Sequence, residues 1–458
     1  MLKYNLQPMK HLLLRLLAFA LFSPNLFAQW TQTAGPEGGL VYCVEKVGDE
    51  IWAGTQGGLY ISTDDGDSWQ LSPDVPAIDY VSHILVYGDT VVMLVSHYNQ
   101  FETDYEINVF VRTAPGNDWS KHSTPVLYWD GFATILFLND FGLFVAGSGI
   151  LSRSTDLGVS WNPVVYPPGI NYTQSITNDG NRIFTDADIY NTAWVDYNVY
   201  STDGGATWQT MPAFPPDVSY DQIFVENDLI LLAGYDTLLY RSTDFGATWQ
   251  TVPVQNYHVN LRRGDDGLLY ALSNRLRRSA DDGLTWIYGP TASLPSGASD
   301  FARLSDGSYV LGSPKGVYTV DADLSEWLAS NTGLRATKVY YQFVSPEGYV
   351  YVSVDQGFFV SKNAGASWQT VLPDSLGSDR YVFEMLFLGD TIVGANGNAV
   401  LFSFDHGQTW SKMTPAWSSG SLPSIQSLGY FENTLYAVGN RFFKTSDWGQ
   451  TWTESTMP

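Results

Sequence analysis

Short apolar runs alternate with polar turns along almost the whole chain. One unit has such runs at residues 222–225, 229–234 and 238–242, and a short extended stretch follows at 250–253. The runs are rich in β-branched and aromatic residues, and Gly, Asp, Asn and Pro bound them, which is typical of strands. No stretch after residue 28 sustains the three-to-four residue period of an amphipathic helix. The pattern predicts an all-β protein.

An eight-residue phrase recurs in register with these runs. It reads Ser/Thr-x-Asp/Asn-x-Gly-x-Ser/Thr-Trp and occurs at residues 62–69, 154–161, 201–208, 242–249, 279–286, 361–368, 403–410 and 445–452. Weaker copies at 113–119 and 320–327 fill the gaps, so that ten units follow one another at intervals of about forty residues. A period of this size indicates stacked supersecondary units, and four short strands per unit are typical of a β-propeller blade. We therefore expect ten four-stranded blades.

The residue types of the phrase suit a tight turn between the third and fourth strands. Gly allows a positive φ, Asp or Asn bonds nearby backbone amides, and Ser or Thr hydroxyls satisfy further amides. The Trp opens the outer strand and can cover the hairpin. We expect a structural role for these residues, namely Asp64, Trp69, Asp156, Trp161, Asp203, Trp208, Asp244, Trp249, Asp281, Trp286, Asn363, Trp368, Asp405, Trp410, Asp447 and Trp452.

The phrase resembles the Asp-box, also called the bacterial neuraminidase repeat. That repeat is found in sialidases, sortilin-type (VPS10) receptors, xyloglucan-degrading enzymes and photosystem assembly factors. The resemblance covers nearly all of residues 29–458. It implies a propeller whose boxes lie on the outer rim, away from the functional face.

The spacing favours one ring of about ten blades over two smaller rings. From Trp208 onward the repeat tryptophans stay close to 41 residues apart, and no Pro/Gly-rich linker divides the units. Most propellers have four to eight blades, so two smaller rings stay the alternative. Residues 30–33 resemble the stretch after each repeat Trp and are candidates for closing the ring against the last blade.

The first 28 residues have the pattern of a secretory signal peptide. A basic start, an apolar core and a small residue at Ala28 predict export, and no later run is long enough to cross a bilayer. Cys43 is the single cysteine, which excludes an intrachain disulfide. We expect an extracytoplasmic protein, either secreted or periplasmic, that is a monomer.

Charge and composition exclude several classes of ligand. The net charge of −24 becomes −27 when Lys3, Lys10 and Arg15 leave with the signal peptide. Such a field disfavours nucleic acids and anionic membranes. The six histidines show no metal-ligand spacing, and we expect neither a metal site nor a cofactor.

Four residues outside the repeated phrase are candidates for ligand binding. Trp129 and Trp417 lie in loops, where aromatic side chains can stack on a sugar or a peptide. Arg275 and Arg277 belong to an Arg-rich segment at 262–278, which could bind an anion. The alternatives are packing between blades for the tryptophans and pairing with local acids for the arginines.

Two functions stay open at this point. The first is a non-catalytic binding or scaffolding module for an extracellular or periplasmic protein or glycan. The alternative is a glycoside hydrolase similar to sialidases or xyloglucanases, which needs two carboxylates at a defined separation. Acidic residues outside the boxes are plentiful, but the sequence does not select a pair; examples are Asp130, Asp186, Asp188, Glu226 and Glu384.

Overall fold

The computed structural model describes residues 37–455 with internal gaps. The gaps are 77–78, 100–103, 117, 126–134, 148–149, 167–175, 192, 213, 216–219, 235–237, 255–259, 274, 290–296, 337–338, 355–356, 372–380, 398, 414–424 and 440. The described residues form ten four-stranded antiparallel sheets and no helix. This confirms the prediction of an all-β propeller protein with ten four-stranded blades.

Each sheet takes four strands in chain order, and we number the sheets as blades 1 to 10. The strands of blades 1 to 3 are β2 (Val41–Val47), β3 (Glu50–Thr55), β4 (Gly58–Ser62) and β5 (Gln70–Leu71); β6 (Tyr80–Tyr87), β7 (Thr90–Asn99), β8 (Asp104–Arg112) and β9 (Ser120–Ser123); and β10 (Ile135–Asn139), β11 (Gly142–Gly147), β12 (Ile150–Ser154) and β13 (Asn162–Pro163).

Blades 4 to 7 repeat the same order. Their strands are β14 (Ile176–Asp179), β15 (Arg182–Asn191), β16 (Ala193–Ser201) and β17 (Gln209–Thr210); β18 (Tyr220–Glu226), β19 (Leu229–Gly234), β20 (Leu238–Ser242) and β21 (Gln250–Pro253); β22 (Asn260–Arg263), β23 (Leu269–Leu272), β24 (Leu276–Ser279) and β25 (Ile287–Tyr288); and β26 (Asp300–Arg303), β27 (Tyr309–Ser313), β28 (Gly316–Val320) and β29 (Leu328–Ala329).

Blades 8 to 10 complete the set. Their strands are β31 (Val339–Val344), β32 (Val350–Val354), β33 (Gly357–Ser361) and β34 (Gln369–Thr370); β35 (Glu384–Leu388), β36 (Thr391–Ala395), β37 (Val400–Ser403) and β38 (Ser411–Met413); and β39 (Ile425–Phe431), β40 (Thr434–Gly439), β41 (Phe442–Thr445) and β42 (Thr453–Ser455). Two further strands, β1 (Gly38–Gly39) and β30 (Arg335–Ala336), pair with each other in parallel.

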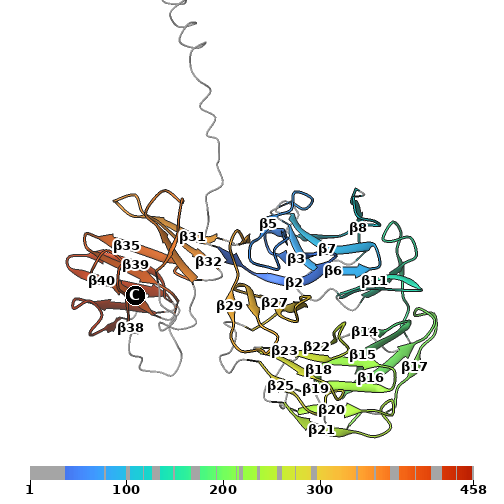
Figure 1. Cartoon of the computed structure of the whole chain (residues 1–458). Coiled ribbons are helices and arrows are strands. Elements are labelled where there is room, and N and C mark those ends of the chain that lie inside the picture. Colours follow the sequence, from blue (N-terminus) through green and yellow to red (C-terminus); the bar gives the residue numbers. More distant parts are fainter. Residues whose placement is uncertain are drawn as a thin grey trace, which may run out of the picture.

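Blade 1 packs directly against blade 7. The inner strand β2 contacts β26 and β27, and the Val44 amide donates a 3.1 Å hydrogen bond to Asp300 Oδ2. One apolar cluster spans the junction and includes Ile51 from blade 1 and Val310 from blade 7. Figure 1 shows the first seven sheets around a common centre, with the red and orange sheets of blades 8 to 10 beside them.

These contacts differ from the arrangement that we expected. A single ring of ten blades requires blade 1 to pack on blade 10, but it packs on blade 7. The contacts thus favour the alternative, in which the ten blades divide into smaller groups. Residues 30–33, the candidates for ring closure, lie outside the described residues.

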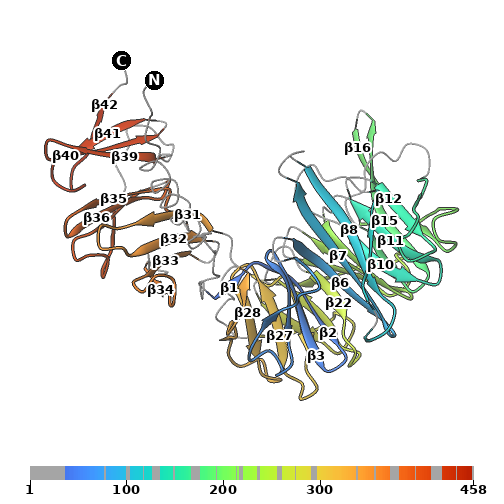
Figure 2. The same ribbon diagram turned by 90° about the horizontal axis from the view of Figure 1, so that it is seen from above.

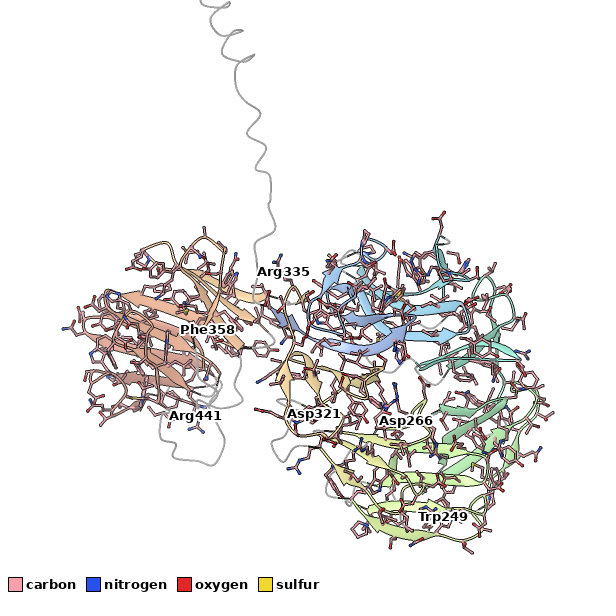
Figure 3. All side chains as sticks on the ribbon, viewed as in Figure 1. Trp249, Asp266, Asp321, Arg335, Phe358 and Arg441 are labelled. Atoms are coloured by element: carbon pink, nitrogen blue, oxygen red, sulfur yellow. The ribbon has the colours of Figure 1, made fainter. Side chains whose placement is uncertain are left out.

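The box of a blade packs against the blade before it, and in blade 1 against blade 7. A Cβ added at the box glycine Gly158 of blade 3 would lie 2.5 Å from a methyl group of Val109 in blade 2. The Trp69 indole of blade 1 donates to the Ser330 carbonyl that follows blade 7, at 2.9 Å. Figure 3 labels Trp249, which lies at the outer edge of the seven-sheet ring. The glycine is therefore required both by its turn and by the neighbouring blade.

The first Ser of each box holds the turn together from inside. Ser154 is fully buried; its Oγ accepts a 2.7 Å hydrogen bond from the Gly158 amide and donates one of 2.7 Å to Asp156 Oδ1. Asp156 Oδ2 in turn accepts the Ser160 hydroxyl at 2.6 Å. Both carboxylate oxygens of Asp156 therefore accept hydrogen bonds within the turn, which agrees with a structural role for the box.

The box turn contains two successive left-handed residues. The residue before the box glycine has a φ between +54° at Asp282 and +71° at Gly204 in all eight complete copies. The glycine itself follows with a φ between +80° and +94°. Only the second left-handed residue can be predicted from the sequence, because it is the box glycine. The first position holds side chains such as Leu157 and Phe245 as well as glycine.

Hydrogen bonds from the Ser160 hydroxyl and amide lower the pKa of Asp156 to about 2. A carboxyl whose folded pKa is depressed stabilises the fold at pH values above its ordinary pKa. That contribution is lost as the pH falls toward 2. Asp156 is therefore ionised at neutral pH, with its hydrogen bonds to the turn in place.

We expect Ser154→Ala to lower the free energy of unfolding by about 1–3 kcal/mol, because it leaves the buried Gly158 amide without its acceptor. Thr155→Ala is the matched control, since Thr155 is exposed at a variable position of the same box. Chemical denaturation of both variants measures the difference. Equal stability of the two variants would contradict a structural role for the box serine.

Candidate functional site

The two ends of the seven-sheet ring carry different turns and loops. The boxes and the turns between first and second strands lie at one end, because first and third strands run in the same direction. The other end, which we call the entry face, carries the starts of the inner strands and the loops between second and third strands. A ligand site on this face is separated from the boxes by the length of the strands.

Several inner strands are distorted at the entry face. The register shifts between Val41 and Cys43 in β2 and between Val81 and His83 in β6. The same irregularity occurs near the start of β18, β31 and β39. Bulges redirect side chains and are enriched next to functional sites. They place Tyr42 and Ser82 outside the regular alternation of their strands.

Two residue pairs lie at the entry face of blades 1 and 2, Tyr42 with Tyr80 and Asp79 with His97, and we call the two pairs together the Tyr42–His97 cluster. The Tyr42 and Tyr80 rings lie edge to face with centroids 6.5 Å apart. His97 Nδ1 lies 2.6 Å from Asp79 Oδ1, and the His97 side chain is 36% exposed while Asp79 is buried. A buried carboxylate thus orients a partly exposed imidazole, and Asp79 directly precedes Tyr80 in the chain.

Two hairpins extend this face. In blade 2, β7 and β8 pair as far as Asn99 with Asp104, and in blade 4, β15 and β16 pair as far as Asn191 with Ala193. The corresponding hairpin of blade 1 ends already at Thr55 with Gly58. Figure 2 shows β7, β8 and β16 reaching beyond the other strands of the ring. The entry face is therefore raised on one side.

A second polar group lies on the inner strands of blades 1, 6 and 7. Arg262 Nη1 bonds Asp300 Oδ1 at 2.8 Å, and the guanidinium lies 4.2 Å from the Phe301 ring centroid. Burial raises the pKa of Glu45 to about 7; Asp300 adds to this shift and Arg262 opposes it. Burial also raises the pKa of Asp300, against the influence of Arg262 and two backbone amides.

Asp300 is engaged on both of its oxygens. Besides Arg262, Oδ1 accepts the Phe301 amide at 2.9 Å, and Oδ2 accepts the Val44 amide of the next blade at 3.1 Å. Two other inner strands use the same contact to the following blade. The pairs are Leu261 N to Gln222 Oε1 and Leu428 N to Glu384 Oε2, each at 2.6 Å. These side chains join neighbouring blades.

The acidic residues that we considered for catalysis fall into three groups. Glu384 binds the Leu428 amide, and Glu226 accepts the Arg263 guanidinium at 2.9 Å. Asp130 lies outside the described residues, and the side chains of Asp186 and Asp188 are not described. Among the described candidates, both carboxylates thus have structural partners.

Of the four candidate ligand-binding residues, the structure describes Arg275 and Arg277, and neither belongs to the Tyr42–His97 cluster. Trp129 and Trp417 lie outside the described residues. Arg277 is fully buried in β24, and its guanidinium lies 5.4 Å from the Tyr288 ring centroid, which favours a packing role. Arg275 is half-buried just before β24.

The residues of the Tyr42–His97 cluster were not selected from the sequence. Asp79 and His97 are 18 positions apart, and Tyr42 comes from another blade. The available signal is weak: a histidine on a second strand, and an aspartate directly before an inner strand. Asp79 meets His97 because β6 pairs with β7: Tyr80 lies opposite Ser96, so Asp79, one residue earlier, is level with His97.

Within the described part of the chain, no group of three His, Cys, Asp or Glu residues could hold a metal ion. The described residues also include no helix long and apolar enough to cross a membrane.

Comparisons with known proteins agree with this architecture. The sequence model of the BNR/Asp-box repeat matches residues 199–210 and 401–412, in blades 4 and 9. The chain therefore carries BNR/Asp-box repeats in a β-propeller fold. No curated protein matches the chain.

Among solved structures, the GH74 enzyme of Niastella koreensis is similar. It is 16% identical with a TM-score of 0.57, and the match covers 93% of this chain and 74% of the enzyme. YCF48 bound to D1 peptide is 18% identical (TM-score 0.28, 60% and 94% covered). The extracellular domain of BT4673 from B. thetaiotaomicron is 11% identical (TM-score 0.23, 91% and 71% covered). At these identities only the fold is shared, and only the first TM-score supports it.

We expect Glu45→Gln to stabilise the protein at pH 8 and to have little effect at pH 4.5. A carboxyl with a raised folded pKa favours folding below its ordinary value of 4.5, and that contribution is lost as the pH rises through about 7. Removing the charge at pH 8 should raise the free energy of unfolding by about 1–2 kcal/mol. Chemical denaturation at both pH values measures the difference.

Glu106→Gln is the control for this measurement, because Glu106 is exposed on β8. A Glu45→Gln effect of the same size at both pH values would contradict the proposed titration.

Proposed function

We propose that the protein is an exported, non-catalytic binding module whose entry face at blades 1 and 2 takes an extracellular or periplasmic glycan or protein segment. The observation that carries the proposal is the Tyr42–His97 cluster. It presents two tyrosine rings and an oriented imidazole at the end of the ring opposite the boxes. Export rests on the predicted signal peptide at residues 1–28, and Trp129, Trp417 and Arg275 stay predicted contributors.

The chemistry of the Tyr42–His97 cluster favours a neutral ligand. Tyrosine rings offer flat apolar area together with a polar hydroxyl, which suits a sugar ring or an uncharged peptide segment. The buried Asp79 holds the His97 ring in one orientation, so that the imidazole provides a fixed polar contact. The net charge of −24 repels polyanions at longer range.

The described carboxylates favour binding over hydrolysis. A glycosidase of the usual kind needs one carboxyl as acid and a second as base or nucleophile. Glu45 has a pKa suited to a general acid, but the nearby Asp300 has both oxygens committed to Arg262 and to backbone amides. Asp300 is therefore not free to act as the second carboxyl beside Glu45.

A glycoside hydrolase is the second candidate, and the raised pKa of Glu45 is the observation that favours it. The similarity to the GH74 enzyme concerns the fold and adds no argument for activity. Turnover of any chromogenic glycoside that disappears in Glu45→Gln would establish this alternative and overturn the binding module.

We expect the purified protein to bind members of a glycan array without hydrolysing them. Tyr42→Ala and Tyr80→Ala should each weaken binding of the best glycan about tenfold, because each removes one ring of the pair. Biolayer interferometry with the immobilised glycan measures the affinity, and a panel of chromogenic glycosides tests for turnover.

Tyr87→Ala is the matched control, because Tyr87 ends the same strand β6 at the box end and is 54% exposed. Glycan binding that Tyr87→Ala weakens as much as Tyr80→Ala does would place the site elsewhere. If no glycan binds, crosslinking of the native protein and the same variants to extracellular proteins tests for a protein ligand.

A further inference from the structure

Five of the described inner strands contain a bulge near their start. The extra residue of each bulge lies at the end of its blade opposite the box turn. In blades 1, 2, 5, 8 and 10 these residues are Tyr42, Ser82, Asp221, Tyr340 and Gln426. Tyrosine thus occupies the position twice among the described bulges, once in the seven-sheet ring and once in blades 8 to 10.

The box register shows that Tyr42 and Tyr340 are equivalent. The reference is the residue of the second strand that pairs with the first serine of the box, which is Ile51 in blade 1 and Val350 in blade 8. In both blades, the residue before the bulge lies opposite the fourth residue after this reference. The two tyrosines therefore hold the same place in their sheets.

The following blade supplies a second tyrosine in both cases. Tyr80 of blade 2 and Tyr381 of blade 9 are equivalent, because each lies seven residues before the end of an inner strand that closes in the same two-residue turn. The Tyr42 and Tyr80 rings meet at 64° with centroids 6.5 Å apart. Tyr340 and Tyr381 meet at 72° with centroids 4.8 Å apart. The edge-to-face tyrosine pair is thus repeated.

The pair in blades 8 and 9 has two further rings beside it. Tyr341 follows the bulge and meets Phe383 at 84°, with ring centroids 5.3 Å apart. Tyr340 is 38% exposed and Tyr341 is 39% exposed. A Cβ added at Gly397 would lie 3.1 Å from the Phe383 ring, so this ring packs closely on the backbone. We call Tyr340, Tyr341, Tyr381 and Phe383 the Tyr340–Phe383 platform.

Packing between blades does not by itself require these rings. Ser82, Asp221 and Gln426 hold the same bulge position in other blades, and none of them is aromatic. The rings therefore mark blades 1 and 8 by side-chain type, although the backbone distortion is shared. A repeated ring pair at the end opposite the boxes indicates a repeated site.

The chemistry of the Tyr340–Phe383 platform suits a neutral sugar. Two rings that meet nearly at a right angle offer one face beneath a sugar ring and a second face beside its edge. The three tyrosine hydroxyls add polar contacts to this flat apolar area. The neighbouring carboxylate, Glu384, directs Oε2 to the Leu428 amide at 2.6 Å, which gives it a partner within the protein.

We propose that the Tyr340–Phe383 platform is a second binding site for the neutral glycan that the Tyr42–His97 cluster takes. One chain then binds two glycan segments. This inference rests on the glycan-binding function proposed above and adds a site to it. A glycan polymer or surface offers many copies of the ligand, so a second contact within the same complex raises the overall affinity.

The number of short oligosaccharides bound per chain tests the second site. The probes are the neutral hexasaccharides cellohexaose, maltohexaose and laminarihexaose, titrated into the purified protein by isothermal calorimetry. We expect two molecules bound per chain for a hexasaccharide that binds. The double variant Tyr340→Ala with Tyr341→Ala should bind one, because it removes the exposed rings of the platform. Tyr42→Ala with Tyr80→Ala should also bind one.

Affinity for the immobilised polymer of the same sugar is the second readout. Either double variant should weaken this binding about a hundredfold, because the second contact within the complex is lost. The two double variants together should abolish binding of both the hexasaccharide and the polymer.

The outcomes separate this proposal from the proposed function. One molecule per chain that is lost only with Tyr42→Ala and Tyr80→Ala overturns the second site and leaves the function standing. One molecule that is lost only with Tyr340→Ala and Tyr341→Ala overturns the site in blades 1 and 2 instead. If none of the three hexasaccharides binds, the second glycan site is wrong, and crosslinking decides whether a protein ligand remains.

Val344→Ala is the matched control, because Val344 ends the same strand β31 at the box end and is 63% exposed. This variant should bind two hexasaccharides with native affinity. Circular dichroism and thermal unfolding check that all variants are folded. A loss of one molecule in Val344→Ala as well would show that binding follows the stability of blade 8, which overturns a direct contact with the platform.

Discussion

The contact between the box of one blade and the body of the blade before it organises this protein. The box glycine leaves room for the preceding blade, as Gly158 does for Val109, and the box tryptophan covers the same junction. The hydrogen bonds of the turn are made within one blade, as in blade 8, but the box tryptophan packs on the neighbouring blade. In blade 1 that neighbour is blade 7.

The seven-sheet ring provides this neighbour by closure, and the closure could not be predicted from the sequence. The repeated phrase correctly indicated ten blades, because strand periodicity and turn chemistry are local. Which blade precedes blade 1 depends on curvature, and Trp69 has the same sequence surroundings whether blade 7 or blade 10 lies beside it. The uniform spacing across Trp327 and Trp368 concealed the boundary, since only residues 330–338 separate blade 7 from blade 8.

The candidate site, too, could be predicted from the sequence only in part. The sequence predicted a structural role for the box aspartates and so excluded them from the candidate ligand-binding residues. Their hydrogen bonds within the turn agree with that role. It did not separate carboxylates that join blades, such as Asp300 and Glu384, from those available to a ligand, because the amides that they bind belong to other blades. The pairing of Asp79 with His97 could not be predicted from the sequence either, since it joins the start of β6 to the far end of β7.

The short parallel pair of β1 and β30 has a mechanical consequence. The Gly38 amide bonds the Leu334 carbonyl at 2.7 Å, so the segment entering the ring is fastened to the segment leaving it. Because the two strands run in the same direction, tension between the N-terminal segment and blades 8 to 10 pulls them past each other in shear. Such a load passes through this pair first, and the seven sheets lie outside its direct path until the pair separates.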